Sequence, residues 1–192
     1  KYINYNVISI FGDIFKKYNM KNSILIIFVL FLSAFTMSDV TLYSKNQKLI
    51  LKSLNKLWLE STIATSEIKE SAAKIKTNHF ELFKIIVNGK GKGFLYITEA
   101  PSKVEKFTYM IVFNRDLTIK YTEVLEYREN YGSEISSKRF LRQFEGKSNG
   151  QNLDFNKDVD GISGATISSH SITNSIKKAT LNVSEHRTLK LL

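Results

Sequence analysis

The residues best suited to chemistry lie in one segment near the end of the sequence, Asp160-Gly161-Ile162-Ser163-Gly164-Ala165-Thr166-Ile167-Ser168-Ser169. Its glycines allow a tight turn in which the backbone can approach a ligand closely. Hydroxyl side chains then gather where a helix is expected to begin, and a helix N-terminus favours an anion, phosphate above all. Two interpretations follow from the residues alone. Either the Thr166 hydroxyl points at a bound anion, or the segment is an ordinary turn with Ser168 as the helix N-cap.

The elements that would position this segment include four strands, predicted from runs rich in β-branched and aromatic residues. The expected strands are residues 80–87, 94–98, 106–113 and 117–127. Turn signals separate them, so the spacing predicts an antiparallel meander. The glycine-rich stretch 89–93 lacks the spacing and the terminal Lys-Ser/Thr of a P-loop, and a hairpin connection is expected there instead.

Helices are expected to flank the meander. Apolar periodicity predicts them over residues 45–60, 136–144 and 168–183. Trp58, in the first of these, is expected to anchor the core. The order helix, meander, helix, loop, helix lacks strict β-α alternation, which is typical of an α+β fold with the 160–165 loop leading into the C-terminal helix. The other expected core residues of the helices are Ile50, Leu54, Leu57, Phe140, Leu141, Phe144, Ile172, Ile176 and Ala179.

The composition excludes several kinds of site. The 192 residues include no cysteine, which excludes disulfides, thiolate metal sites, iron–sulfur clusters and c-type haem attachment. A redox role would therefore need an organic cofactor. His79, His170 and His186 do not pair at metal-ligand spacing, and no catalytic triad or carboxylate pair can be identified. No catalytic or metal-binding residue is therefore assigned.

The positive charge is spread along the chain. The formal net charge is +10, but no basic block is interleaved with aromatic residues, which argues against nucleic-acid binding. Lys45, Lys48, Lys52 and Lys56 lie at helical spacing. They indicate either a solvated surface or a surface near anionic lipid or an acidic partner.

The segment 160–169 resembles the flavinylation motif of the FMN-binding domain family. That family includes the C subunit of the sodium-pumping NADH:quinone oxidoreductase and the G subunit of the Rnf complex. The resemblance implies that Thr166 carries FMN through a phosphodiester bond, attached by an exported flavin transferase that uses FAD and magnesium. It also implies that the recognition sequence and flavin cradle consist of Asp160, Gly161, Ser163, Gly164 and Ala165.

A second stretch, residues 127–147, supports the resemblance, which covers about residues 80–183. It is similar to the family's Glu-x-x-Gly loop and to the Gln-Phe-x-Gly-Lys segment after it. This similarity implies that Glu129 and Gly132 lie near the flavin; a solvated acid and an ordinary turn glycine are the alternatives. The larger subunits have Glu-Thr-Pro-Gly-Leu-Gly where this chain has Glu-Asn-Tyr-Gly-Ser-Glu, which indicates a small stand-alone exported member. Three aromatic residues are candidates either to pack the flavin ring or to fill the core: Tyr127, Tyr131 and Phe140.

The N-terminal part of the sequence predicts export. Residues 23–37 are almost wholly apolar, follow Met20-Lys21, and are shorter than the roughly 20 residues of a comfortable membrane span, which is the layout of a secretory signal. Small residues suit a cleavage site after Ser38, although retention as an anchor stays open. The expected organisation is an upstream segment with the signal or anchor at 1–38, a helical segment at 39–79, the FMN-binding domain at 80–183 and a tail at 184–192.

These features predict an electron carrier, or a subunit of an oxidoreductase system, in the periplasm or on the outer face of the cytoplasmic membrane. Its expected partners are the flavin transferase and membrane or periplasmic redox proteins. A covalent tether suits an exported carrier, which has no pool of free FMN to rebind. Two alternatives are a flavin-free binding module of the same fold and a small flavin-dependent reductase with a pocket beside the flavin. The chain has no Gly-x-Gly-x-x-Gly fingerprint, which argues against direct NAD(P)H oxidation.

Overall fold

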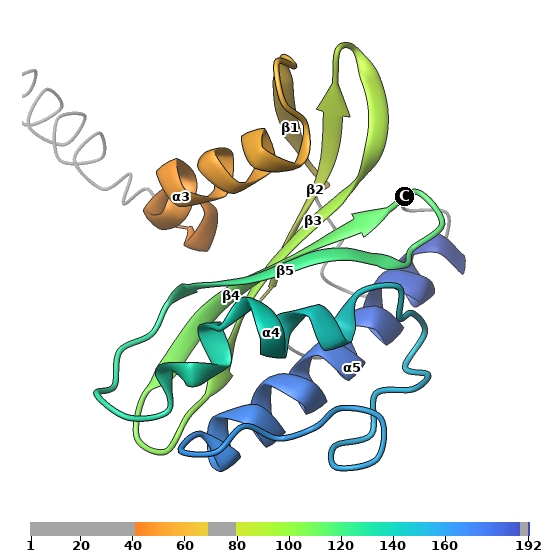
Figure 1. Ribbon diagram of the computed structural model, residues 1–192. Coiled ribbons are helices and arrows are strands. Elements are labelled where there is room, and N and C mark those ends of the chain that lie inside the picture. Colours follow the sequence, from red (N-terminus) through yellow and green to blue (C-terminus); the bar gives the residue numbers. More distant parts are fainter. Residues whose placement is uncertain (1–40, 69–79, 189–191) are drawn as a thin grey trace, which may run out of the picture. The chain divides into compact units, whose positions relative to one another are not determined.

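A five-stranded antiparallel sheet, with its strands in sequential order, organises the computed structural model, which describes residues 41–68, 80–188 and 192 (Figure 1). Each strand pairs with the next, so the predicted meander and the α+β class are confirmed. The strands are β1 (Ile63–Glu67), β2 (Phe80–Val87), β3 (Lys90–Pro101), β4 (Lys106–Asn114) and β5 (Ile119–Glu126).

The glycine-rich stretch is a hairpin, as expected. Asn88 and Gly89 adopt positive φ values of 50° and 74°, which suits a tight turn between β2 and β3. β3 then starts at Lys90, so the strand is longer than the expected 94–98. β1 was not expected, because its sequence, Ile-Ala-Thr-Ser-Glu, lacks an apolar run. None of its residues is fully buried.

The helices are α3 (Leu42–Leu57), α4 (Lys138–Leu141) and α5 (Thr166–Thr188), with 3₁₀ turns η1 (Ser133–Ser136) and η2 (Arg142–Phe144) on either side of α4. The single helix expected at 136–144 is therefore broken into three short pieces. The interpretation of Ser168 as the N-cap of the last helix is wrong. The Ala165 carbonyl already accepts from Ser169 N, which places Ser168 inside the first turn of α5.

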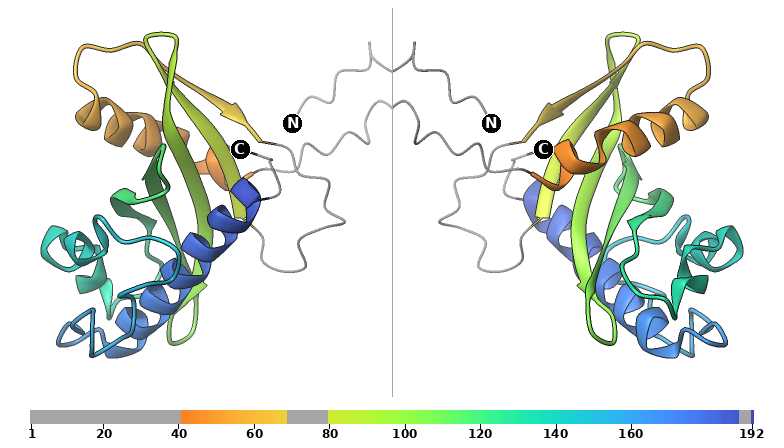
Figure 2. Two further views of the ribbon diagram at one scale, coloured as in Figure 1. Left: turned by 90° about the vertical axis from the view of Figure 1, so that its right-hand side faces the viewer. Right: turned by 90° about the vertical axis from the view of Figure 1, so that its left-hand side faces the viewer.

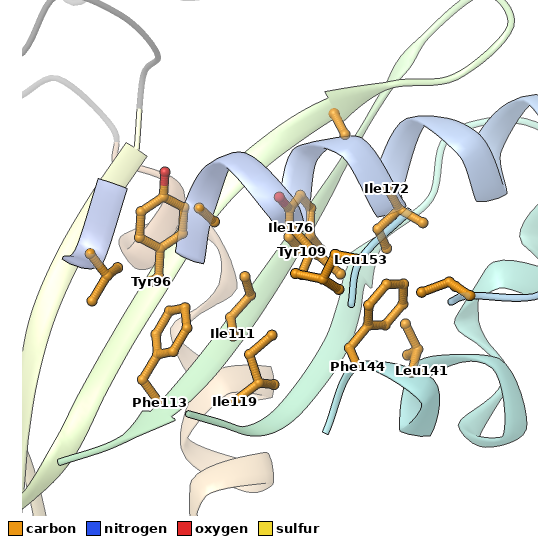
Figure 3. Close-up of a cluster of buried hydrophobic side chains, with 14 of the residues drawn as sticks. Tyr96, Tyr109, Ile111, Phe113, Ile119, Leu141, Phe144, Leu153, Ile172 and Ile176 are labelled. Atoms are coloured by element: carbon orange, nitrogen blue, oxygen red, sulfur yellow. The ribbon is translucent and has the colours of Figure 1, made fainter. Parts of the chain in front are cut away.

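Buried side chains form one cluster on each face of the sheet, because successive strand residues point to opposite faces. The first cluster joins α4, η2 and α5 to the sheet (Figure 3). Its members include Tyr96, Tyr109, Ile111, Phe113, Phe140, Phe144, Ile172 and Ile176. The second cluster joins α3 to the other face and includes Ile50, Leu54, Ile85, Leu95, Ile97, Met110 and Val112. The side views show α3 beside the upper half of the twisted sheet and α5 along its lower half (Figure 2).

Trp58 follows α3 directly and is partly buried against the second cluster. The Lys120 ammonium lies 5.6 Å from its ring centroid, within cation–π range. No helix among the residues that the structure describes is long and apolar enough to cross a membrane. The apolar run 23–37 and His79 lie outside the described residues.

Candidate functional site

The segment 160–165 forms a tight loop that ends in α5, and the exposed Thr166 is the first residue of that helix. Ala165 is buried and its N–H donates to the Ile162 carbonyl (3.1 Å). Ser169 closes the turn, because its hydroxyl donates to the Ala165 carbonyl (2.8 Å) and accepts from Ile162 N (3.3 Å). Gly164 has a φ of 85°, a conformation that residues with a side chain rarely adopt. The loop therefore fixes the backbone immediately before Thr166.

Gln143 holds the start of this loop. Its side-chain amide donates to the Asp160 carbonyl (3.1 Å), and its side-chain oxygen accepts from Asp160 N (2.8 Å). Lys147 lies in the same segment, where its ammonium donates to the carbonyls of Asn152 (2.5 Å) and Asp158 (2.8 Å). Burial lowers the pKa of Lys147. The segment similar to the family's Gln-Phe-x-Gly-Lys sequence thus holds the loop through hydrogen bonds between its side chains and the backbone of residues 152, 158 and 160.

Three hydroxyl groups join the two neighbouring loops to the first turn of α5. Ser102, from the β3–β4 connection, lies 3.0 Å from the Tyr127 hydroxyl and 2.9 Å from the Ser168 hydroxyl. The Tyr127 and Ser168 oxygens are 2.9 Å apart. Tyr127 donates its proton to the Tyr131 carbonyl (2.8 Å), so in this cluster it can only accept, and the two serine protons are shared among the three oxygen pairs. We call these three residues the hydroxyl cluster.

Gly132 packs directly on the hydroxyl cluster. Its φ is 88°, and a Cβ at this position would lie 2.4 Å from the Tyr127 hydroxyl and 2.9 Å from the Ser168 hydroxyl. Only glycine fits there without movement of a neighbour. The second predicted stretch is therefore in contact with the segment that carries Thr166.

Glu129 ties the loop after β5 to the β3–β4 connection. Its Oε1 accepts from Val104 N (2.9 Å) and from Glu105 N (2.8 Å). The hydrogen bond from Glu105 N has the larger effect, and together the two bonds hold the pKa of Glu129 below its usual range. The β3–β4 connection, this loop and the start of α5 lie at one end of the molecule (Figure 1). A place for Glu129 facing the flavin stays a prediction.

The remaining predicted positions of the segment differ in their surroundings. A Cβ on Gly161 would lie 3.0 Å from the Phe155 ring, and one on Gly164 would lie 3.4 Å from the Glu134 carboxylate. Asp160 and Ser163 are exposed. Of the aromatic candidates, Phe140 is buried in the core and Tyr127 packs on Phe107 with 5.6 Å between ring centroids, whereas Tyr131 is 84% exposed.

A groove with a volume of about 710 Å³ begins at the first turn of α5 and lies between one side of that helix, the second half of β3 and the start of β4. Ile167, the residue after Thr166, lines it, and further along α5 it is bordered by His170, Asn174 and Lys178. His170 Nε2 lies 3.1 Å from the Asn174 amide nitrogen. The opposite wall includes Ser102, Lys106 and Glu99, so the lining combines apolar surface with two lysines and one carboxylate.

Sequence reasoning did not single out Ser102, Gln143 or Glu134 as parts of this site. Gln143 lies within the segment that resembles the family, so a signal for it was present. Ser102 carries no local signal, because its partner Ser168 lies 66 residues away, and Glu134 stands in the resembling stretch at a position where this chain departs from the family.

The residues fit a phosphate ester carried on Thr166. Its hydroxyl lies at the surface, and the first N–H groups of α5 have no partner within the helix and favour a negative charge. Within the described ranges, no group of three or more His, Asp or Glu residues could hold a metal ion.

Comparison with known protein families matches residues 104–180 to the FMN-binding domain. The matched region starts in the β3–β4 connection and ends within α5. It includes Glu129, Gly132 and the whole 160–166 segment, so the two stretches singled out in the sequence fall inside one family domain. No curated relative matches the chain.

Proposed function

Because residues 104–180 are an FMN-binding domain, we propose that the chain is an exported electron-transfer flavoprotein with FMN bound covalently to Thr166 through a phosphodiester bond. The observation that carries the proposal is the position of Thr166. It is an exposed hydroxyl residue at the N-terminus of α5, directly after a loop whose backbone is fixed by Gln143 and Ser169.

Thr166 would supply the oxygen of the new phosphorus–oxygen bond and lose its proton, while AMP leaves from the FAD used by the transferase. The first-turn N–H groups of α5 would then face the phosphate and stabilise its negative charge. Bound FMN supplies one- and two-electron redox chemistry, and the protein sets its position, polarity and solvent access.

The groove beside Ile167 supports this assignment, because its volume of about 710 Å³ offers room for the ring next to its attachment point. The ammonium groups of Lys106 and Lys178 border the groove. Glu99 also lines the groove, but its carboxylate pairs with Arg128 (3.3 Å). The two lysines therefore leave a net positive charge, which would favour an anionic ligand or an anionic reduced state by simple attraction. The same groove favours the second candidate function, a small flavin-dependent reductase. Turnover that depends on an added substrate would distinguish the reductase from a carrier.

Intact-mass measurement tests the attachment. The chain is co-expressed with a flavin transferase as wild type, Thr166→Ala, Thr166→Ser and Ser136→Ala, the last being a control that removes an exposed hydroxyl from a neighbouring loop. Wild type and Ser136→Ala should gain the mass of one FMN less one water, together with in-gel flavin fluorescence. Thr166→Ala should gain neither, and Thr166→Ser should retain part because its oxygen remains. Flavin mass on Thr166→Ala, or none on wild type, would refute the assignment; the second result would favour the flavin-free module.

Export is part of the same proposal and rests on the apolar run 23–37. N-terminal sequencing of protein from the cell envelope should find either cleavage near Ser38 or a retained apolar segment. The intact chain in the cytoplasmic fraction would contradict export.

A further inference from the structure

Helix α3 carries a row of lysines on its solvent-facing side. Lys45, Lys48, Lys52 and Lys56 are all exposed. At 3.6 residues per turn they fall within about 80° around the helix axis and along roughly 16 Å of its length. The sequence of α3 contains no acidic residue and no arginine. The row is therefore a continuous strip of like charge.

The opposite side of α3 is fixed to the protein. Ile50 and Leu54 are fully buried in the cluster beneath the helix. At the N-terminus of the helix, the Glu81 carboxylate of β2 accepts from Leu42 N (2.5 Å) and from Tyr43 N (2.8 Å). The lysine row is thus held in a set direction by a helix that cannot roll on the sheet.

Leu49 lies beside the row and is 45% exposed. By helical geometry it falls between the lysine row and the buried side of α3, about 40° from Lys45. In the sequence, four residues separate the apolar run 23–37 from the start of α3. An apolar residue flanking the charges is a feature of helices that lie at a lipid surface.

We propose that the α3 lysine row is a contact surface for anionic phospholipid headgroups. Each lysine near an anionic bilayer raises binding roughly fivefold, so four acting together give an effect on the order of several hundredfold, reduced by salt. This inference does not depend on the attachment of FMN to Thr166.

The chemistry of the row favours lipid over an acidic protein. Lysine is a compact point charge on a flexible stem and does not form the planar two-point contact with a carboxylate that arginine does. A straight, evenly spaced row also has no concave shape to select one partner. Lipid headgroups can rearrange around the ammonium groups, so binding to an anionic bilayer requires only positive charge on the protein and no matching shape.

Contact through α3 would orient the domain. α3 and α5 pack on opposite faces of the sheet, because the residues of the two buried clusters alternate along the strands. Thr166 starts α5, so a bilayer against α3 leaves the exposed Thr166 on the aqueous side. There the transferase and redox partners can reach it.

The absence of cysteine allows a clean labelling test with the full chain. Leu49→Cys and, as a control, Leu181→Cys are each labelled with an environment-sensitive fluorophore. The two leucines are equally exposed, at 45%, but Leu181 lies on α5 on the other side of the sheet. Vesicles of phosphatidylcholine alone are compared with vesicles containing phosphatidylglycerol, because the apolar run can bind either kind.

We expect a blue shift from the label at position 49 only with phosphatidylglycerol, lost at high salt, and none from the label at position 181. Replacing Lys45, Lys48, Lys52 and Lys56 with glutamine should abolish the shift. Replacing four exposed lysines elsewhere should not; these are Lys92, Lys103, Lys138 and Lys157. The proposal fails if phosphatidylglycerol has no effect at position 49 or if both quadruple variants lose the shift equally. A response to soluble polyglutamate but not to the vesicles would indicate an acidic protein and also overturn it.

Discussion

Gly132→Ala tests whether the loop after β5 must rest directly on the first turn of α5. Alanine at a φ of 88° carries a backbone penalty of about 1–2 kcal/mol. Its Cβ would also lie 2.4 Å from the Tyr127 hydroxyl and 2.9 Å from the Ser168 hydroxyl, and overpacking of this kind costs roughly 1–3 kcal/mol. Together these give a loss of about 2–5 kcal/mol in the free energy of unfolding.

Gly146→Ala is the matched control. Gly146 also has a positive φ, 77°, but a Cβ added to it would have no atom within 4 Å, so only the backbone penalty of about 1–2 kcal/mol applies. With a urea dependence of about 2 kcal/mol per molar, Gly132→Ala should lower the unfolding midpoint by roughly 1–2.5 M and Gly146→Ala by roughly 0.5–1 M.

A double variant identifies the clashing atom. Tyr127→Phe removes the hydroxyl nearest to the added Cβ, so Tyr127→Phe/Gly132→Ala should lose less stability than the sum of the single variants, by about 0.5–3 kcal/mol. Equal losses in Gly132→Ala and Gly146→Ala, or strict additivity in the double variant, would show that Gly132 is required only for its backbone angle and that the contact with the hydroxyl cluster is unimportant.

Three further predictions concern the loops around Thr166. If Glu129 lies near the flavin, Glu129→Gln should raise the reduction potential, since a nearby negative charge disfavours anionic reduced forms; an unchanged or lower potential in a spectroelectrochemical titration would contradict this. Because the folded pKa of Glu129 is lowered, its stabilising effect is present above the unfolded pKa and is lost as pH falls through the folded pKa. The difference in urea midpoint between wild type and Glu129→Gln should therefore shrink from pH 7 to pH 3. Gly164→Ala and Asp160→Ala should reduce the rate of FMN attachment, measured by intact mass, while the fold survives. Alanine at the Gly164 φ of 85° carries a backbone penalty of about 1–2 kcal/mol, its Cβ would lie 3.4 Å from the Glu134 carboxylate, and Asp160 is exposed.

Periodicity predicted the parts of the fold whose signal is local. The apolar stripe of α5 and the runs of β-branched and aromatic residues in β2 to β5 can each be recognised within a few neighbouring residues. β1 escaped detection, because an edge strand with only partly buried residues has no such stripe.

The start of α5 shows why local signals fail at the site. Ser168 has the right side chain for an N-cap, and its sequence neighbourhood favours that role. In the fold, however, its hydroxyl bonds to Tyr127 and Ser102, which lie 41 and 66 residues away. The helix begins two residues earlier, at Thr166. The motif predicts Thr166 as the acceptor, whereas the contacts that position this residue depend on tertiary structure.

The contacts of the loop after β5 show which positions of the family's Glu-Thr-Pro-Gly-Leu-Gly sequence are retained in this chain and which differ. The two residues that match, Glu129 and Gly132, have fixed roles: one accepts two backbone N–H groups, and the other packs on the hydroxyl cluster. The residues that differ all have exposed side chains: Asn130, Tyr131, Ser133 and Glu134. Substitution at these exposed positions changes the surface that a ligand or partner meets. The departures are therefore compatible with the same cofactor site. What differs between this chain and the larger subunits is the set of exposed side chains on the loop beside the first turn of α5.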